Sequence, residues 1–513
     1  MLVTNFAKHQ YLQGLQRYLF VSSSMISTPE NSPLITISRA EYERLLQTEK
    51  DLEKAKLEQS YLMQEIANLK RMLFGKKSER FAKDPTPKPQ EERSKPNTAT
   101  KDTASSGHRR EPIPANLPRE EVIIEPEENT EGLTRIGMAE SEYYAYIPGK
   151  LVVIRVIRPK YLNKETGEII IAPMPVMPIP YSNAGASILA HIAVSKFVDH
   201  QPLYRQSQIL KRNQGVHLAE STLNGWFSGT CNLLDPLYDT LKTEVQASPY
   251  LQADETPIPV LTKDKPGSTH KGYRWVYHSY PKKLVCFVYH KSRSREGPSA
   301  FLKDFSGTLQ TDAYQAYDLF EDKENVELLA CWAHARRYFE KALDSDKTRA
   351  AYALSEIRKL YAIEGLGRDQ QMTPDQIQLL RVNQAVPILS GLKAWIEQQQ
   401  PDVLPKSPIG KAFAYSLSLW DRLERYTKNG HWLIDNNLIE NTIRPVTLGR
   451  KNYLFAGSHA GAARAAMMYS FFGSCKLNGI NPWEWLSYVL SVIPNYKVSQ
   501  LKDLLPSNYK KQS

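Results

Sequence analysis

One acidic side chain lies among amides and cations in the stretch IDNNLIENTIRPVTLGRKNYLFAGS. On a helix, Glu440 shares a face with Asn437 and Arg444, because residues three and four apart are neighbours. A Glu–Arg pair at this spacing is also common on ordinary solvated helices. Asparagine is a poor helix former that favours caps and turns, so the asparagines of this stretch need another explanation. The cations that follow, Arg450 and Lys451, are of the kind that binds phosphate groups. A lone carboxylate does no phosphoryl chemistry, so the stretch requires acidic partners elsewhere.

Two further carboxylates stand where predicted strands lead into them. Asp254 lies in LQADET and Asp312 in LQTDAYQAYD. Phosphodiester transfer places charge on the attacking and leaving oxygens, which two divalent ions about 4 Å apart stabilise. Carboxylate oxygens are the ligands that Mg²⁺ prefers, and three close carboxylates repel one another without metal. We therefore predict that Asp254, Asp312 and Glu440 are catalytic and hold two Mg²⁺ (or Mn²⁺) ions.

Each acid also has a structural interpretation. Asp254 could cap a turn, and Asp312 could be the N-cap of a helix that begins there. Glu255 is a rival for Asp254, although strand alternation places the two on opposite faces. Taken together, the three acids favour the catalytic interpretation, because each falls on the element that the chemistry requires.

The elements around these acids predict an α/β catalytic core. Apolar and β-branched runs favour strands, and a 3.6-residue period favours helices. Three antiparallel strands, a helix and then alternating strands and helices match a ribonuclease H-like layout, in which such acids meet at one sheet edge. The predicted strands are 250–261, 271–280, 284–290, 307–310 and 326–330, and the predicted helices are 298–304 and 332–343.

Composition limits the class of protein. The chain has 513 residues, enough for several domains of roughly 150 residues. Its net charge of +11 indicates a polyanionic partner, with DNA the first candidate. No apolar run is long enough to span a membrane. The four cysteines are far apart and favour a reducing cytoplasm over disulfides or a cysteine-built zinc site; they are Cys231, Cys286, Cys331 and Cys475.

The N-terminal part predicts self-association. Residues 1–33 read as a disordered extension, with Met25 as an alternative start. Ser38 and Glu41 have capping-box spacing, and apolar residues then recur in steps of three and four through residues 34–83. This pattern predicts a coiled coil, or leucine zipper, that makes the protein a homo-oligomer. A long surface helix is the alternative.

Three segments separate the coiled coil from the core. Residues 84–118 are rich in Pro, Lys and Ser and predict a linker. Residues 119–180 predict a small β module, with strands at 121–124, 143–147, 151–158 and 168–172. Residues 181–245 predict helices broken at Gly215, an arrangement typical of a helix-turn-helix or of any α-hairpin. The nearby cations favour DNA contact; they are Arg205, Lys211 and Arg212.

The motifs QADET, QTDAYQAYD, CWAHARRYF and DNNLIENTIRPVTLGRKNYLFAGS together resemble the insertion sequence 66 family of bacterial DDE transposases. The resemblance runs from about residue 37 to the C-terminus. It implies the triad Asp254, Asp312 and Glu440, in a multidomain α+β and α/β chain. It also implies a core in two parts, 246–341 and 431–460, around a helical insertion, 342–430, with a C-terminal helical region at 461–513.

The resemblance also bears on the neighbours of the acids. Cys331 and His334 match a Cys-x-x-His signature of related transposases, but two ligands make a poor zinc site. We expect a core cysteine with a histidine near the active site, and a direct catalytic role for His334 is the alternative. His334, Cys331 and Asn437 are candidates for catalytic support. The cations beside the acids are predicted to bind DNA phosphates; they are Arg336, Arg337, Arg444, Arg450 and Lys451.

The chain departs from the family in one place. Family members usually carry a zinc-binding Cys-x-x-Cys pair near Tyr161, whereas this chain has Leu162, Asn163, Glu165 and Thr166 there. We therefore expect a metal-free β module and no zinc.

By resemblance, the chain is a bacterial cytoplasmic, nucleoid-associated transposase. Such an enzyme binds the terminal inverted repeats of its element, cleaves the DNA ends and joins them to target DNA, in some cases with accessory proteins of the same element. Two other interpretations remain open at this stage. One is a catalytically silent DNA-binding regulator or domesticated transposase, and the other is a ribonuclease H-like nuclease without strand joining.

Overall fold

The computed structural model describes residues 149–157, 160–162, 169–171, 176–262 and 267–510, with seven positions between Ser38 and Asp51. The chain divides into two units, Met1–Leu73 and Phe74–Ser513. In the first unit, the backbone N–H of Glu41 donates to Ser38 Oγ at 3.3 Å, as the capping pattern predicts, and the described positions beyond it are helical. The predicted extension, the coiled-coil seam apart from Thr48, the linker and the strands at 121–124 and 143–147 lie outside the described residues.

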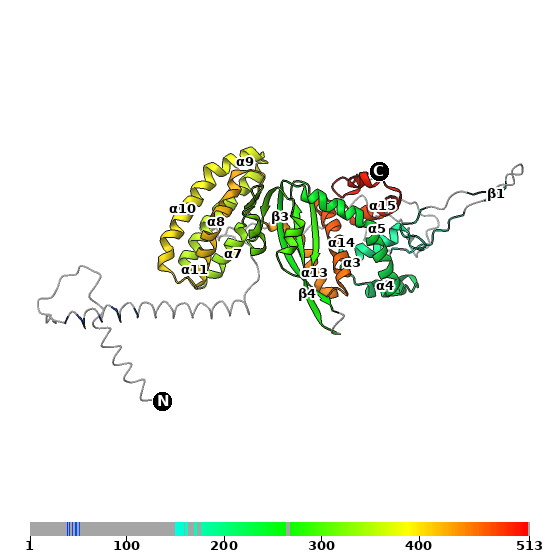
Figure 1. The fold of residues 1–513 in the computed structure, drawn as a ribbon, viewed down its shortest axis with the longest axis horizontal. Helices are drawn as coiled ribbons and strands as arrows, with labels where there is room; N and C mark the ends of the chain where they lie inside the picture. Colours follow the sequence, from blue (N-terminus) through cyan, green and yellow to red (C-terminus); the bar gives the residue numbers. More distant parts are fainter. Residues whose placement is uncertain are drawn as a thin grey trace, which may run out of the picture. The chain divides into compact units, whose positions relative to one another are not determined.

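The second unit is built on a mixed five-stranded sheet (Figure 1). Its strand order is β5-β4-β3-β6-β7. The first three strands in sequence pair antiparallel, and β6 and β7 then run parallel to β3. The sequence predicted all five, which are β3 (Tyr250–Leu261), β4 (Thr269–Ser279), β5 (Leu284–His290), β6 (Gly307–Gln310) and β7 (Val326–Leu329).

Helices cover the β5 side of this sheet and complete its main core. Helix α14 (His459–Leu477) packs on β5, and its serine hydroxyls form hydrogen bonds with the backbone of that edge strand. Ser470 Oγ accepts from the N–H of Phe287 at 2.7 Å, and Ser474 Oγ accepts from that of Val285 at 3.0 Å. An edge strand whose donors are satisfied in this way is closed to pairing with another chain.

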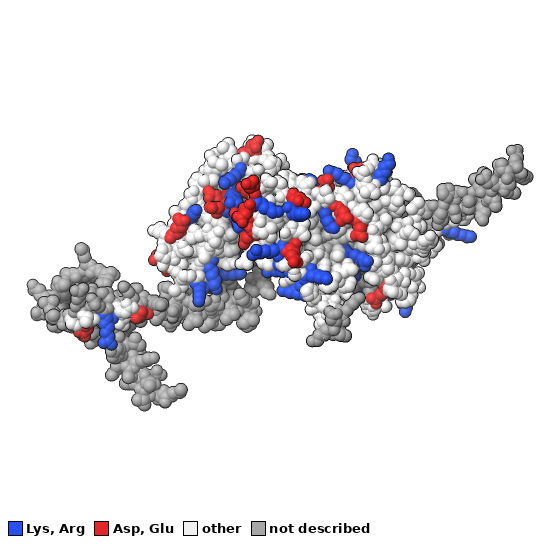
Figure 2. Space-filling view, viewed as in Figure 1, with Lys and Arg blue, Asp and Glu red and all other residues white. Residues whose placement is uncertain are grey.

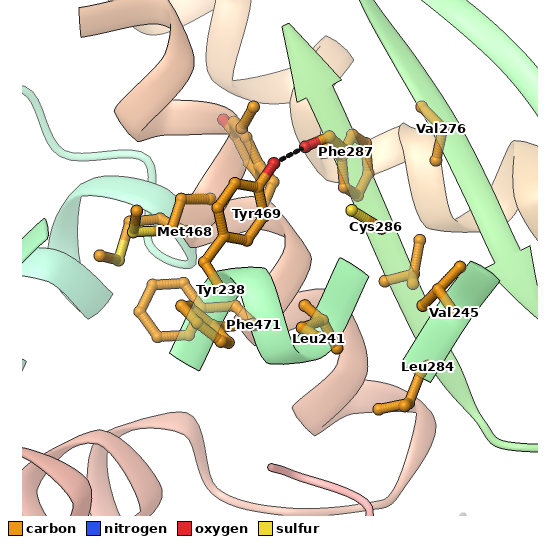
Figure 3. Packing of buried hydrophobic residues seen from close by; sticks show 14 of the residues in the cluster. Tyr238, Leu241, Val245, Val276, Leu284, Cys286, Phe287, Met468, Tyr469 and Phe471 are labelled. Carbon is orange, nitrogen blue, oxygen red and sulfur yellow. Dashed lines mark hydrogen bonds between the residues drawn. The ribbon is translucent and has the colours of Figure 1, made fainter. Parts of the chain in front are cut away.

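Aromatic side chains fill the space between the sheet and its helices (Figure 3). The hydroxyl of Tyr238 on α5 donates to the carbonyl of Phe287 on β5. Phe471 of α14 packs edge-on against the Tyr238 ring. The other helices on this side are α3 (Ala186–Phe197), α4 (Leu203–Gln214), α5 (Glu220–Gln246), α13 (Asn437–Tyr453) and α15 (Pro482–Val492), followed by the 3₁₀ helices η5 (Ile493–Asn495) and η6 (Val498–Leu504).

The chain between β7 and α13 forms a helical bundle with a core of its own. Helix α7 (Trp332–Ala342) starts it, and Ile357, Leu392 and Phe413 are among the residues at its centre. The bundle comprises α8 (Lys347–Asp369), α9 (Pro374–Leu380), the π-helix η2 (Arg381–Ala385), α10 (Val386–Gln399), η3 (Gln400–Asp402), α11 (Pro408–Ser418), α12 (Trp420–Glu424) and η4 (Arg425–Lys428). Short helix α6 (Glu296–Phe301) joins β5 to β6, and 3₁₀ helix η1 (Gln315–Phe320) joins β6 to β7.

The predicted strand at residues 151–158 is wrong for residues 151–157. These residues belong to no strand or helix within the described part of the chain. Their backbone is instead held by Gln214 of α4, which accepts from the N–H of Leu151 and donates to the carbonyl of Gly149. The two-stranded ladder forms further on, where β1 (Lys160–Leu162) pairs antiparallel with β2 (Ile169–Ile171). β-Branched composition favours an extended backbone, but only a partner makes it a strand.

Candidate active site

The sheet register aligns the two predicted aspartates. Strands β3 and β6 are parallel neighbours, and Gln252 is the partner of Gln310. Asp254 lies two residues further along β3, on the same face as Gln252, because side chains alternate with a period of two, and Asp312 lies two residues beyond Gln310, the last residue of β6. The two acids therefore stand side by side where β6 ends.

The backbone around Asp312 differs from the prediction of a helix N-cap. The following helix, η1, begins only at Gln315, with Tyr314 at its N-cap position. Asp312 Oδ1 instead accepts from the N–H of Tyr314 at 3.0 Å, and Ala313 has a φ of 65°. This short turn lets Asp312 continue the line of β6 before the chain bends away, so the N-cap interpretation is wrong.

The third acid, Glu440, lies in the first turn of α13 and is held by a cation. Arg337 of α7 donates to both of its oxygens at 2.7 Å. His334 Nε2 lies 3.8 Å from Glu440 Oε1 and 3.0 Å from an Arg337 nitrogen. Sequence reasoning assigned Arg337 to DNA phosphate, whereas the structure pairs it with the carboxylate.

Charge repulsion links the three acids. Burial raises the pKa of Asp254 well above its ordinary value, and the negative charges of Asp312, Glu255 and Glu440 raise it further. A hydrogen bond from the N–H of Glu255 to Asp254 Oδ1, 2.7 Å long, opposes this shift. The field at Asp254 is thus negative and undercompensated, which suits a bound cation.

The three acids are not grouped as a metal site. Within the described ranges, no three His, Cys, Asp or Glu side chains are grouped closely enough to hold one metal ion. Both carboxylate oxygens of Glu440 are bonded to Arg337. The negative charge of Glu440 nevertheless contributes to raising the pKa of Asp254.

Two acids beside the triad have structural roles that the sequence pattern did not reveal. The side chain of Glu255 is 3% exposed and is bonded by Arg293, whose guanidinium lies 3.8 Å from the centre of the Tyr314 ring. Burial and then the charge of Asp312 raise the pKa of Glu255, while Arg293 lowers it. Glu255 thereby ties the Asp312 turn to the sheet through Arg293 and Tyr314.

Asp435 anchors the start of α13. It accepts from the Tyr361 hydroxyl of α8 at 2.8 Å and from the backbone and side-chain amides of Asn437 at 3.0 and 2.6 Å. Burial raises the pKa of Asp435. Asn437, a predicted supporting residue, thus organises the helix that carries Glu440. From the same bundle, the Tyr415 hydroxyl of α11 donates to the carbonyl of Asp312 at 3.2 Å.

Cys331 is fully buried at the start of α7. Its sulfur accepts from the N–H of Asn436 at 3.3 Å. Burial raises the pKa of this thiol to about 12, so it stays protonated at neutral pH. A protonated, enclosed thiol is a core side chain and a poor metal ligand.

The predicted DNA-binding cations fall into two groups. Arg336 is buried and bonded to Glu340, and Arg450 is half-buried and donates to the carbonyl of Pro257. Together with Arg337 they are engaged inside the protein. The others are exposed, and they are Arg205, Lys211 and Arg212 of α4, with Arg444 and Lys451 of α13.

The exposed cations of α4 and α13 belong to neighbouring elements. Arg205 donates to Asn452 Oδ1 at 3.1 Å, which joins α4 to the end of the Glu440 helix. Helix α4 ends at Gly215, in the left-handed conformation, and α5 follows after a short turn. On the face shown in Figure 2, Lys and Arg lie interspersed with Asp and Glu.

Three protein-family models match parts of the chain. The model of the IS66 transposase family matches residues 181–464, and that of the IS66 C-terminal element matches residues 470–507. A third model, described as the transposase C of IS166 homeodomain, matches residues 61–122. Within the described residues, no helix has the length and apolar character needed to cross a bilayer.

Two relatives come from Sinorhizobium fredii (strain NBRC 101917 / NGR234). The uncharacterized protein y4jD is 33% identical over 421 residues, which cover 78% of this chain and 81% of that protein. The uncharacterized protein y4qI is 32% identical over 419 residues, covering 77% of this chain and 76% of that protein.

Proposed function

The chain belongs to the IS66 transposase family, and from that premise we propose that it is an active DNA transposase of a bacterial insertion sequence. It binds the terminal inverted repeats of its element, cleaves the DNA at those ends and transfers the exposed strands to target DNA. The side-by-side register of Asp254 and Asp312, with Glu440 in electrostatic reach, carries this proposal.

The strand order supports a ribonuclease H-like catalytic core. Three antiparallel strands followed by two parallel ones place the first strand, β3, in the middle of the sheet beside the fourth, β6. Asp254 on β3 and Asp312 just beyond β6 would therefore meet at this edge, and α13 would bring Glu440 from much later in the chain. The helical bundle between β7 and α13 is then an insertion into that core.

The donor set fits hard divalent cations. Asp254, Asp312 and Glu440 would hold two Mg²⁺ or Mn²⁺ ions, and the negative field at Asp254 favours such binding. The bound ions supply stabilisation of the attacking and leaving oxygens and activation of water. Glu440 would become available as a metal ligand only after its ion pair with Arg337 breaks. A DNA phosphate is a suitable competitor for that guanidinium, because Arg binds phosphate and carboxylate with the same two-pronged geometry.

The remaining parts of the chain supply DNA contacts and pairing of ends. The exposed cations of α4 and α13 would follow the DNA backbone, with α4 and α5 as a helix-turn-helix. The predicted coiled coil would join two subunits, since two transposon ends must be processed together. The protein would act in the bacterial cytoplasm at the nucleoid.

The test is an assay with purified protein, Mg²⁺ and a labelled duplex carrying the inverted repeat of the element. Cleavage at the repeat and joined products with a target plasmid are expected for the wild type, and neither for Asp254→Asn. Binding without cleavage would identify a silent regulator instead. Cleavage without joined products would identify a nuclease.

A further inference from the structure

The tetrapeptide L-Q-x-D occurs twice in the chain, ending at Asp254 and at Asp312. The structure places the two copies in register on parallel neighbouring strands, with Leu251 opposite Leu309 and Gln252 opposite Gln310. The two glutamines therefore lie directly before the two aspartates on the same face of the sheet. Both are fully buried.

These glutamines bond to each other and to the segment that precedes the Glu440 helix. Gln252 Nε2 donates to Gln310 Oε1 at 2.8 Å and to the carbonyl of Asp435 at 2.9 Å. Gln310 Nε2 donates to the carbonyl of Leu433 at 2.8 Å.

Tyr250 closes the network. Its hydroxyl donates to Gln310 Oε1 at 2.6 Å and accepts from the N–H of Leu433 at 3.2 Å. The strands that bear two of the acids are thus joined to the segment that leads into the third.

We propose that Gln252 and Gln310 form a clasp that positions Glu440 relative to Asp254 and Asp312. Helix α13 starts two residues after Asp435, and Glu440 lies in its first turn. A helix is rigid over one turn, so fixing the backbone at 433–435 fixes where the Glu440 carboxylate begins. The glutamines touch no substrate, and they act through the backbone that they hold.

The cost of these side chains supports a specific role. Both side chains are fully buried, and within the described part of the chain Gln252 Oε1 has no hydrogen-bond partner. Burying an amide oxygen without a partner costs free energy, and this cost is offset by the bonds that the two amides donate to the carbonyls of Asp435 and Leu433. Two amides whose donors reach the same loop define one placement of that loop, which apolar packing does not.

The proposal rests on the proposed function, and its test separates the two. The variants are Gln252→Met and Gln310→Met, which keep side-chain length and remove the amides. Gln246→Met is the matched control, because Gln246 also bonds a backbone carbonyl, that of Phe301, away from the acids. Gln252→Asn, which keeps an amide but is too short to reach the loop, serves if a Met variant does not fold.

Three quantities are measured on each folded variant: DNA affinity, the single-turnover cleavage rate on saturating DNA and Mn²⁺ affinity by electron paramagnetic resonance. We expect the clasp variants to bind DNA like the wild type and to cleave about 10- to 100-fold more slowly, because a shift of about 1 Å has that effect. Their Mn²⁺ affinity should fall as well, while Gln246→Met keeps both values.

Wild-type rate and Mn²⁺ affinity in both clasp variants would overturn the proposal. If the wild type does not cleave, the proposed function fails, and the Mn²⁺ comparison alone decides on the clasp. A wild type that neither cleaves nor binds Mn²⁺ overturns both.

Discussion

Replacing Arg337 by Gln should make the acidic site bind divalent cations more tightly in the absence of DNA. Both oxygens of Glu440 are bonded to Arg337, so a cation must displace the guanidinium before it can use this carboxylate. Removing the guanidinium also makes the field at the acids more negative. Both effects act in the same direction on cation affinity.

The size of the effect follows from the exposure of the pair. A hydrogen bond to a charged group contributes about 1.5–3 kcal/mol, and less where solvent screens it. The side chains of Arg337 and Glu440 are 22% and 31% exposed, so the contribution of this pair lies toward the low end of that energy range. A displacement cost of about 1.4 kcal/mol corresponds to a tenfold change in affinity. We expect Mn²⁺ to bind about tenfold more tightly to Arg337→Gln.

Mn²⁺ titration followed by electron paramagnetic resonance measures this affinity directly. The matched control is Arg349→Gln, because Arg349 forms a similar ion pair with Asp346 in the helical bundle, with exposures of 29% and 16%. The control should lose comparable stability with no change in Mn²⁺ binding. Equal or weaker Mn²⁺ binding by Arg337→Gln than by the wild type would refute the reasoning.

Three further predictions concern other parts of the chain. Gly307→Ala should lower the free energy of unfolding by about 2–3 kcal/mol in urea titrations, because Gly307 has a φ of 139° and a Cβ there would lie 2.5 Å from the carbonyl oxygen of Pro249; an unchanged midpoint would contradict this. Burial lowers the pKa of His278 to about 4. As pH falls below about 6.5, this histidine is therefore protonated in the unfolded chain but stays neutral in the folded chain. Stability should therefore fall between pH 6.5 and 4 by roughly 3 kcal/mol more in the wild type than in His278→Leu, and parallel pH curves would disprove it. Elemental analysis of the purified protein should find zinc well below one atom per chain, and stoichiometric zinc would overturn the expectation of a metal-free β module.

The local elements of the core could be predicted from the sequence. Residues 284–290 and 307–310 alternate or are apolar over strand-like lengths, and they form β5 and β6. The run at residues 151–157 is similarly rich in β-branched residues, but within the described part of the chain it forms no strand. β propensity alone does not supply a neighbouring strand to pair with.

The contacts between distant elements could not be predicted in the same way. Periodicity placed Glu440 on a helix, but the guanidinium that holds it comes from α7, 103 residues earlier in the chain. Side-chain pairing across the fold depends on tertiary placement, which a helical or strand period does not encode. One signal was present and unused, namely the repeated L-Q-x-D, which marks the two strands that lie in register.

The most direct test of the central claim is a crystal structure of the protein bound to transposon-end DNA with Mn²⁺, using anomalous scattering to locate the metal. The account predicts Mn²⁺ peaks within coordination distance of carboxylate oxygens of Asp254, Asp312 and Glu440, with Arg337 moved from Glu440 to a DNA phosphate. Peaks elsewhere, with Glu440 still bonded to Arg337 in the DNA complex, would contradict it.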